Sequence, residues 1–313
     1  MIRLPAQVQV VEVAPRDGLQ SFKRPVDTAT KVHLVDRLSD AGFPVIEVGG
    51  FAHPRAIPNL ADAEAVFERI RRKPGVVYRG LVPNARGAER AAAARVDEML
   101  GLTIVSQAYL ARNQNMTADQ AVAEAVKAFH IAERHSIRFV MALGMSFWCP
   151  YEGTIPRAAV LSQLKRLRNA GIRSFYLAGS VGMEDPRHVN ELFAHAYDAV
   201  PDIELGFHVH NLGGMATANI LAALDAGARW IEGAICGIGG GIAMPASLGS
   251  VGNFPTEDLV AYLELMGVST GLDAAAVRAA ALDVAAMLDI SPRSHAGQGV
   301  TRQNIQTRPA SAE

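Results

Sequence analysis

Arg16 and Asp17 stand side by side directly after an apolar, β-branched stretch, in the segment VEVAPRDGLQ (residues 11–20). A carboxylate can bind a divalent cation, and a neighbouring guanidinium can stabilise a developing enolate or alkoxide. However, Asp before Gly also starts many turns, and adjacent Arg and Asp side chains often form only a surface ion pair. The chemistry elsewhere in the chain has to decide between these two interpretations.

A second polar cluster ends the apolar segment IELGFHVHN (residues 203–211). Residues two apart on a strand point to the same face, so His208 and His210 converge if this segment is a strand. The spacing favours a metal site, although a pair of hydrogen-bonded core histidines fits it as well. With Asp17 and Asn253, these side chains offer carboxylate, imidazole and amide ligands, a set that suits Mn²⁺, Mg²⁺, Zn²⁺ or Co²⁺.

The segment CGIGGGIAMPASLGSVGNFPTEDL (residues 236–259) is rich in glycine. A dinucleotide fingerprint that begins at Gly237 needs a glycine at position 242, where isoleucine stands, and a helix directly afterwards. The segment continues instead into Ala-Met-Pro, so we exclude a dinucleotide site. The glycines favour a mobile loop that covers a binding site.

Short apolar segments alternate with amphipathic or alanine-rich stretches along the whole chain. The expected strands cover residues 8–14, 44–51, 76–82, 97–105, 137–145, 174–179, 203–209 and 230–236. Helical periodicity is found, for example, over residues 30–42, 59–72, 117–135, 157–171, 186–200 and 215–227. This alternation predicts an α/β fold with a parallel sheet, and eight repeats favour a closed (β/α)₈ TIM barrel over an open sheet.

The remaining sequence adds two expected C-terminal helices, over residues 256–268 and 273–288, and a polar tail over residues 290–313. We expect one domain over residues 1–313, because no linker-like stretch divides the chain. In such a barrel, chemistry is located where the strands end and the following loops begin. Both polar clusters described above lie at such strand ends.

Composition excludes several classes of partner. Thirty basic and thirty-one acidic side chains give a formal charge of −1, which favours neither nucleic acid nor an anionic membrane. The chain holds two cysteines, which is no disulfide scaffold, and no run of about 18 apolar residues that could span a membrane. The N-terminal segment breaks at Pro5 and has no signal-peptide core. We expect a cytoplasmic protein that forms a homo-oligomer.

The motifs VEVAPRDGLQ, VIEVGGFAHPR, CPYEG, HVHN and GIGGG…GNFPTEDL occur in an order that resembles the 3-hydroxy-3-methylglutaryl-CoA lyase family. The resemblance runs from about residue 7 to 270 and implies a metal-dependent (β/α)₈ lyase that acts on an acyl-CoA thioester. It also implies one divalent cation, expected to be Mn²⁺ or Mg²⁺, bound by Asp17, His208, His210 and Asn253.

The resemblance further assigns Arg16 to the substrate carbonyl and places Glu47 at or directly behind the metal. Contacts with the substrate or its thioester are expected from Gln20, Lys23, Asn113, Tyr151, Gly239, Gly240 and Gly241.

The chain departs from the family pattern at two positions that handle protons. Gly179 stands where the family has an Asp near the substrate hydroxyl, and Gly241 stands where it has a Cys. A third departure is Asn211, which follows the two histidines in place of Asp. Loss of one positioned proton carrier costs roughly 10²–10⁴ in rate, so another group must replace them. The candidates are His53 first, then Tyr151, Glu47 and Cys236.

These departures favour cleavage of a different 3-hydroxyacyl-CoA, or of a related hydroxy acid, by a retro-aldol or retro-Claisen reaction. Gly179 is expected to leave room for a bulkier acyl group or for a substrate carboxylate. Two alternatives stay open: true 3-hydroxy-3-methylglutaryl-CoA lyase activity, and a barrel that binds metal or coenzyme A without turnover.

Overall fold

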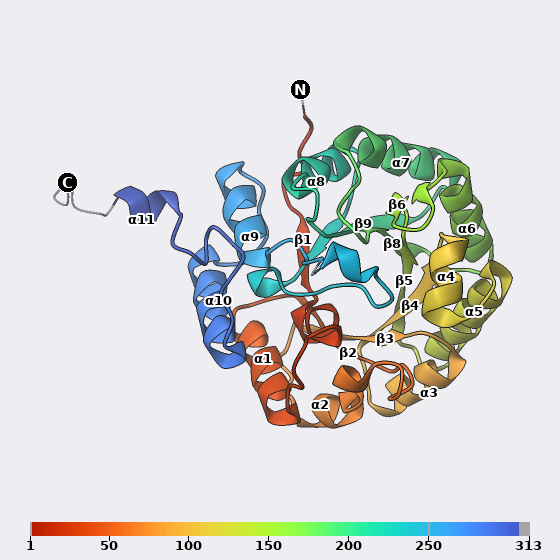
Figure 1. Ribbon diagram of the computed structural model, residues 1–313, viewed down its shortest axis with the longest axis horizontal. Helices are drawn as coiled ribbons and strands as arrows, with labels where there is room; N and C mark the ends of the chain where they lie inside the picture. The colour runs from red at the N-terminus through yellow and green to blue at the C-terminus, as the bar shows by residue number, and fades with distance from the viewer. Residues whose placement is uncertain (1, 250, 307–313) are drawn as a thin grey trace.

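A closed barrel of parallel strands forms the centre of the protein (Figure 1). The computed structural model describes residues 2–249 and 251–306. The strands lie in the order β1, β10, β9, β8, β5, β4, β3, β2 around the barrel. Their bounds are Gln9–Glu12 (β1), Val45–Gly50 (β2), Val77–Val82 (β3), Glu98–Ile104 (β4), Arg138–Gly144 (β5), Ser174–Gly179 (β8), Glu204–Val209 (β9) and Trp230–Gly233 (β10). The expected (β/α)₈ barrel is confirmed.

Helices surround the strands as an outer ring (Figure 1). The ring helices are Thr28–Asp40 (α1), Ala63–Arg69 (α2), Ala85–Ala93 (α3), Ala118–Arg134 (α5), Arg157–Asn169 (α6), Pro186–Ala199 (α7) and Ala216–Asp225 (α8). Their ends follow local sequence signals: Asp27 and Thr117 accept hydrogen bonds from backbone N–H groups at helix starts. Gly42, Gly171 and Gly227 follow helix ends with φ between +92° and +106°.

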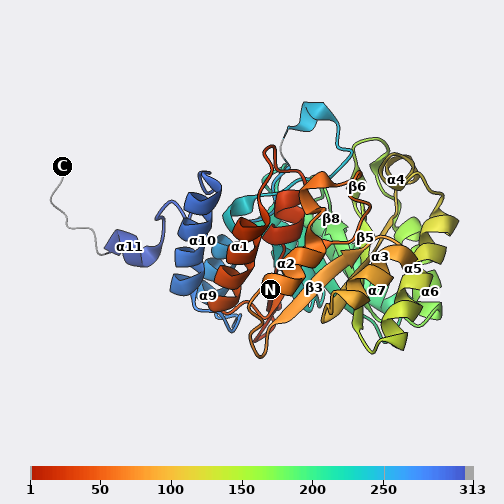
Figure 2. The same ribbon diagram turned by 90° about the horizontal axis from the view of Figure 1, so that it is seen from below.

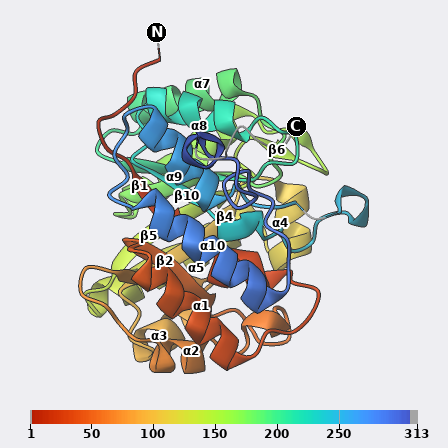
Figure 3. The same ribbon diagram turned by 90° about the vertical axis from the view of Figure 1, so that its left-hand side faces the viewer.

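Several elements extend this minimal barrel. The two expected C-terminal helices, Thr256–Leu265 (α9) and Ala274–Leu288 (α10), are present, and α10 lies against α1 (Figure 3). The helix Gln107–Gln114 (α4) follows β4, and a small antiparallel hairpin, Trp148–Cys149 (β6) and Gly153–Thr154 (β7), follows β5. None of the helices in the described ranges is long and apolar enough to cross a membrane.

Several boundaries differ from the expectations; for example, the helix expected over residues 59–72 covers only Ala63–Arg69. The last barrel strand ends at Gly233 rather than at residue 236, because residues 235–237 form a tight turn in which Cys236 has a φ of +61°. Within the expected polar tail, Arg302–Gln306 forms a short helix (α11), and residues 307–313 lie outside the described part of the chain. The single-domain organisation stays a prediction.

Glu12 ties the first strand to the last one. Its fully buried carboxyl group accepts hydrogen bonds from the backbone N–H groups of Ala14 (2.8 Å) and Ile235 (3.0 Å), and from the Thr256 hydroxyl (2.6 Å). Burial raises the pKa of Glu12 from 4.5 to about 8, although these hydrogen bonds oppose the shift. The group therefore holds a proton in the folded protein near neutral pH.

This protonation predicts a pH-dependent stability. The folded pKa lies above the unfolded one, so the unfolded chain binds fewer protons and the free energy of unfolding falls as pH rises from about 5 to 8. Glu12→Gln does not titrate, and its profile over this range should be flatter than that of the wild type. Urea unfolding at several pH values measures both profiles, and parallel profiles would contradict the assignment to Glu12.

Candidate metal centre and active site

A cavity of about 320 Å³ opens where the barrel strands end. It is lined by Arg16 and Asp17 from the turn after β1, and by His208 and His210 from the end of β9. The segment between β10 and α9, which is the expected covering loop, projects from one end of the barrel (Figure 2). Gly241, Ile242 and other residues of this segment line the same cavity. The two polar clusters of the sequence therefore lie in one site.

The two histidines point at each other. Their Nε2 atoms lie 3.2 Å apart, and both side chains are buried. The Nδ1 atom of His208 lies 3.1 Å from the Glu232 carboxylate, and that of His210 lies 3.2 Å from the backbone oxygen of Val251. Because both partners are acceptors, each Nδ1 atom carries the ring proton when the imidazoles are neutral. Two Nε2 lone pairs then face one another.

This arrangement fits a cation, which relieves the repulsion between the two lone pairs. Ligand-type atoms of Asp17, His208 and His210 all lie within 4.8 Å of one another. The amide nitrogen of Asn253 donates to Asp17 Oδ2 (2.7 Å) and to the backbone oxygen of Ile238 (2.9 Å). Its buried amide oxygen has no hydrogen-bond partner among the described residues, which suits a further ligand.

Arg16 is held by carboxylates on two sides. Its Nε and Nη2 atoms donate to both oxygens of Glu47, at 2.5 and 3.1 Å, and its Nη1 atom donates to Asp17 at 2.7 Å. Glu47 is fully buried and lies behind Arg16 rather than on the cavity wall. Arg16 itself lines the cavity, so the bidentate pair fixes the position of its positive charge.

Glu232 is a positioning residue that sequence reasoning missed. Its carboxylate contacts His208 Nδ1 and accepts hydrogen bonds from Arg79 Nη1 (2.6 Å) and Trp230 Nε1 (3.1 Å). Arg79 also donates to Glu98 at 2.6 Å, which neutralises charge beneath the site. The signal was present in the sequence, since Glu232 is an acidic residue inside an apolar strand, where an unpaired charge is costly.

The glycine loop lies close to the ligand residues. A β-carbon at Gly239, whose φ is +132°, would overlap the Asn253 amide, so this close approach requires glycine. The backbone oxygen of Gly240 accepts a hydrogen bond from Gln20 (3.1 Å), which also donates to Asp17 (2.7 Å). Gln20 thereby connects the loop to the expected metal ligand.

The other expected contact residues fall into two groups. Asn113 lines the cavity and donates to the backbone oxygen of Ile242 (3.4 Å). Tyr151 lies outside the cavity lining and donates to the backbone oxygen of Ala243 (2.8 Å), so both side chains hold the loop. Lys23 is exposed and is not among the lining residues. Its role as a thioester contact stays a prediction.

The structure places only one of two candidate proton carriers, His53 and Cys236, in the cavity lining. His53 lines the cavity and is exposed to solvent, with its Nδ1 atom accepting the Arg55 N–H (3.2 Å). Cys236 is buried and donates to the backbone oxygen of Ala281 in α10, away from the cavity. Burial raises the pKa of the Cys236 thiol, which disfavours a thiolate. His53 is therefore better placed than Cys236.

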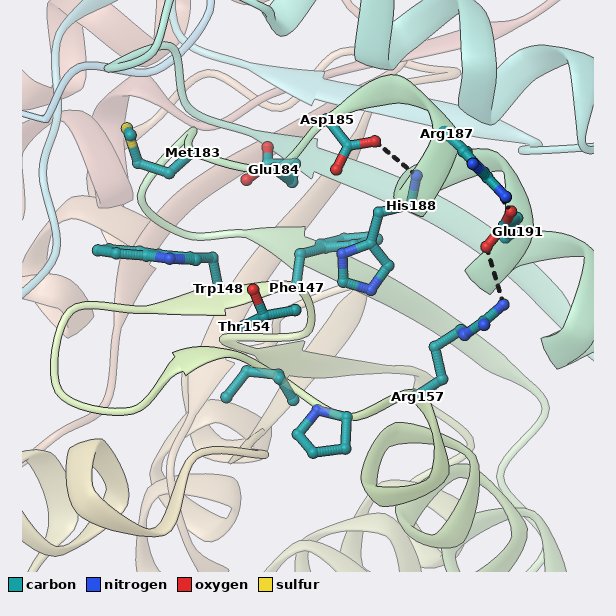
Figure 4. Close-up of a pocket in the computed structure, with 12 residues that line it drawn as sticks. Phe147, Trp148, Thr154, Arg157, Met183, Glu184, Asp185, Arg187, His188 and Glu191 are labelled. Atoms are coloured by element: carbon teal, nitrogen blue, oxygen red, sulfur yellow. Dashed lines mark hydrogen bonds and ion pairs between the residues drawn. The ribbon is translucent and has the colours of Figure 1, made fainter.

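The expected room beside Gly179 does not exist. A β-carbon at this position would overlap the carboxylate of Glu184, which is buried at 2% exposure. Burial raises the pKa of Glu184 to about 7. Glu184 faces an outer cavity of about 390 Å³ between the β6–β7 hairpin and the segment before α7, with Arg157 and Glu191 at its rim (Figure 4). The Glu184 carboxylate therefore occupies the space that an Asp side chain at position 179 would fill.

Tyr176 is a further cavity residue that sequence reasoning missed. It points inward from β8, as Ala178 does, and stacks on His208 with ring centroids 5.4 Å apart. Burial and the carboxylates of Glu232 and Glu47 raise the pKa of its phenol, although Arg16 opposes the shift. The same two-residue alternation that paired the histidines could have placed Tyr176 and Ala178 on the inner wall.

The chain is similar along most of its length to known lyases. The model of the HMGL-like family matches residues 7–284. A mitochondrial hydroxymethylglutaryl-CoA lyase of Mus musculus is 35% identical over 270 residues, which cover 86% of this chain and 82% of the relative. A 3-hydroxy-3-isohexenylglutaryl-CoA/hydroxy-methylglutaryl-CoA lyase of Pseudomonas aeruginosa is 33% identical over 299 residues, covering 96% and 99% of the two chains.

A solved structure of a lyase of this kind is also similar to this chain. An HMG-CoA lyase of Acinetobacter baumannii, in complex with coenzyme A and 3-methylmalate, superimposes with a TM-score of 0.91. Its sequence is 34% identical, and the alignment covers 97% of this chain and 98% of that one.

The contacts of Glu232 predict its effect on metal binding. Glu232→Gln can present its amide nitrogen to His208 and disturb the tautomer, so Mn²⁺ affinity should fall by about 10- to 100-fold. His208→Ala should abolish stoichiometric binding, whereas Glu204→Gln, at the exposed start of β9, should leave it unchanged. Calorimetric titration measures all three, and wild-type affinity in both site variants would show that the ion binds elsewhere.

The overlap at Gly179 predicts that substitutions at Gly179 and Glu184 have coupled effects on stability. Gly179→Asp alone should destabilise the protein by about 1–3 kcal/mol, because its side chain must displace the Glu184 carboxylate. Gly179→Asp combined with Glu184→Ala should recover most of this loss. Thermal unfolding of both single variants and the double variant measures the coupling, and strictly additive effects would refute the contact.

Proposed function

This chain belongs to the HMGL-like family of carbon–carbon lyases, and we propose that its substrate is a 3-hydroxyacyl-CoA, or a related hydroxy acid, other than 3-hydroxy-3-methylglutaryl-CoA. The observation that carries the proposal is the pair of facing imidazoles, with Asp17 and Arg16 in the same cavity. Gly179 and Gly241 support the different substrate, because neither provides a proton carrier.

The proposed reaction cleaves the carbon–carbon bond next to the hydroxyl-bearing carbon of the substrate. The hydroxyl group of the substrate loses its proton, a carbonyl forms at that carbon, and the neighbouring carbon–carbon bond breaks. The bonding pair passes to the carbon next to the thioester, forming an enolate that then takes a proton to give the acyl-CoA product. A Mn²⁺ or Mg²⁺ ion held by Asp17, His208, His210 and Asn253 would lower the pKa of that hydroxyl and polarise the adjacent oxygen.

The chain's own residues have separate tasks in this reaction. Arg16, fixed by Glu47, stabilises the negative charge of the enolate oxygen. His53, which lines the cavity and has a free edge toward solvent, exchanges the proton of the substrate. Asn113 and Tyr151 hold the glycine loop over the cavity and limit the entry of water.

Two finer expectations belong to this proposal. A cytoplasmic location is supported by the two cysteines, both of which are free and buried. Homo-oligomer formation stays a prediction.

The substrate proposal predicts a pattern of turnover. The Mn²⁺-loaded protein should convert at least one other 3-hydroxyacyl-CoA into a shorter acyl-CoA and a carbonyl product, detected by mass spectrometry, at least 100-fold faster than it cleaves 3-hydroxy-3-methylglutaryl-CoA. His53→Ala should lower kcat on that substrate by about 100-fold without changing Mn²⁺ affinity, because it removes a proton carrier and no ligand. His135→Ala, at the exposed end of α5, is the matched control.

Three outcomes would contradict parts of this proposal. Fast turnover of 3-hydroxy-3-methylglutaryl-CoA would make the protein a lyase of its relatives' kind. Tight metal and thioester binding with no product from any substrate would indicate a non-catalytic barrel. Full activity of His53→Ala would leave the lyase assignment intact and exclude His53 as the proton carrier.

A further inference from the structure

One arginine side chain crosses the interior of the barrel. Arg79 lies on β3 and is 2% exposed. Its Nη1 atom donates to Glu232 Oε1 on β10 at 2.6 Å, although β2 and β1 lie between these two strands in the order around the barrel. The hydrogen bond therefore spans the barrel interior instead of joining neighbouring strands.

Three buried carboxylates surround this guanidinium. Glu47 and Glu98 are the register partners of Arg79 on the neighbouring strands β2 and β4. Arg79 Nε donates to Glu98 Oε1 at 2.6 Å. Burial raises the pKa of Glu47, and the positive charges of Arg16 and Arg79 oppose this shift. Arg79 thus offsets the charges of three glutamates, of which only Glu232 contacts an expected metal ligand.

Glu232 uses its two oxygens for different partners. Oε1 accepts hydrogen bonds from Arg79 and from Trp230 Nε1 (3.1 Å), whereas Oε2 lies 3.1 Å from Nδ1 of His208. A carboxylate that is held at one oxygen by two donors cannot turn freely, and the charged donor contributes most of this restraint. Arg79 therefore fixes the direction in which Oε2 points.

This direction matters because it determines which ring nitrogen of His208 is free. An acceptor at Nδ1 keeps the proton of the neutral imidazole there and leaves the Nε2 lone pair available to a cation. Glu232 and His208 are register partners on β10 and β9, so the backbone brings the two side chains together. The register does not set the rotation of the carboxylate, which depends on its other hydrogen bonds.

We propose, on the basis of the metal centre in the proposed function, that Arg79 is a positioning residue of that centre. Its guanidinium holds one oxygen of Glu232 across the barrel and thereby aims the other oxygen at Nδ1 of His208. Arg79 touches neither the ion nor the substrate, and its effect on the ion passes through Glu232 and His208.

Four variants separate this role from simple charge balance. Arg79→Met removes the guanidinium, and Arg79→Lys keeps the charge but lacks the planar fork that holds two carboxylates at once. Arg79→Met/Glu98→Gln removes one positive and one negative charge, so the net charge is kept while Glu232 loses its donor. Arg138→Gln is the matched control, because Arg138 Nε lies 3.7 Å from Glu98 and its side chain is 60% exposed.

Calorimetric titration measures the effect on the metal centre. Mn²⁺ affinity should fall by about 10- to 100-fold in Arg79→Met and in the double variant, because a group that orients a metal ligand is lost. Arg79→Lys should still lose about fivefold or more, and Arg138→Gln should match the wild type. Thermal unfolding is followed in parallel, and the double variant should be more stable than Arg79→Met because it leaves fewer unpaired buried charges.

A second readout needs no metal. The ¹⁵N chemical shifts of labelled histidines report the tautomer, and His208→Gln assigns the signals of His208. Above the pH at which His208 titrates, the metal-free wild type should carry the ring proton on Nδ1. Arg79→Met and the double variant should show a mixture of both tautomers, which a merely stabilising role of Arg79 would not produce.

The proposal fails if the double variant keeps the Nδ1 tautomer and wild-type Mn²⁺ affinity, whatever its stability. Full recovery of both in Arg79→Lys would show that charge alone suffices and would overturn the role of the guanidinium fork. Mn²⁺ binding without turnover of any thioester would contradict the lyase proposal and leave the Arg79 results standing. If the wild type binds no Mn²⁺, the metal centre fails and the tautomers decide on Arg79. Loss of folding in Arg79→Met leaves the decision to the other two Arg79 variants.

Discussion

Two buried imidazole nitrogens that face each other at 3.2 Å dominate the chemistry of this barrel. Their Nδ1 atoms contact acceptors, Glu232 and the backbone oxygen of Val251, so neither neutral ring can turn a proton toward the other. The pair is repulsive unless a positive charge lies between or beside the two nitrogens. The adjacent Asp17 carboxylate makes a divalent cation the charge that this site accommodates best.

The surrounding charges follow from this requirement. Asp17 is the expected carboxylate ligand of the cation, and Glu47 fixes Arg16 through two hydrogen bonds. Glu232 fixes His208 and is itself neutralised by Arg79. Glu47 and Glu232 thus each have an opposite partner, which is the condition under which charges persist in a barrel interior. Arg16 lines the cavity, and a cation bound by the expected ligands would be the second positive group there.

Strand periodicity was sufficient to predict the barrel and the convergence of the two histidines, because parallel strands end at one face. It was not sufficient for contacts between segments distant in the sequence. Gly179 indicated an empty wall, but the carboxylate of Glu184 reaches that space from the following loop. Tyr176 lay within a predicted strand, yet its approach to His208 depends on the register between β8 and β9, which no local pattern encodes.

Electron spin-echo spectroscopy of the Mn²⁺-loaded protein tests the central claim most directly, because it detects the nuclei that touch the ion. The account predicts modulation from two imidazole nitrogens, those of His208 and His210, and line broadening when a 3-hydroxyacyl-CoA labelled with ¹⁷O at its hydroxyl group is added. A spectrum without imidazole modulation, or one that the labelled substrate leaves unchanged, would contradict a metal centre that binds the reacting hydroxyl.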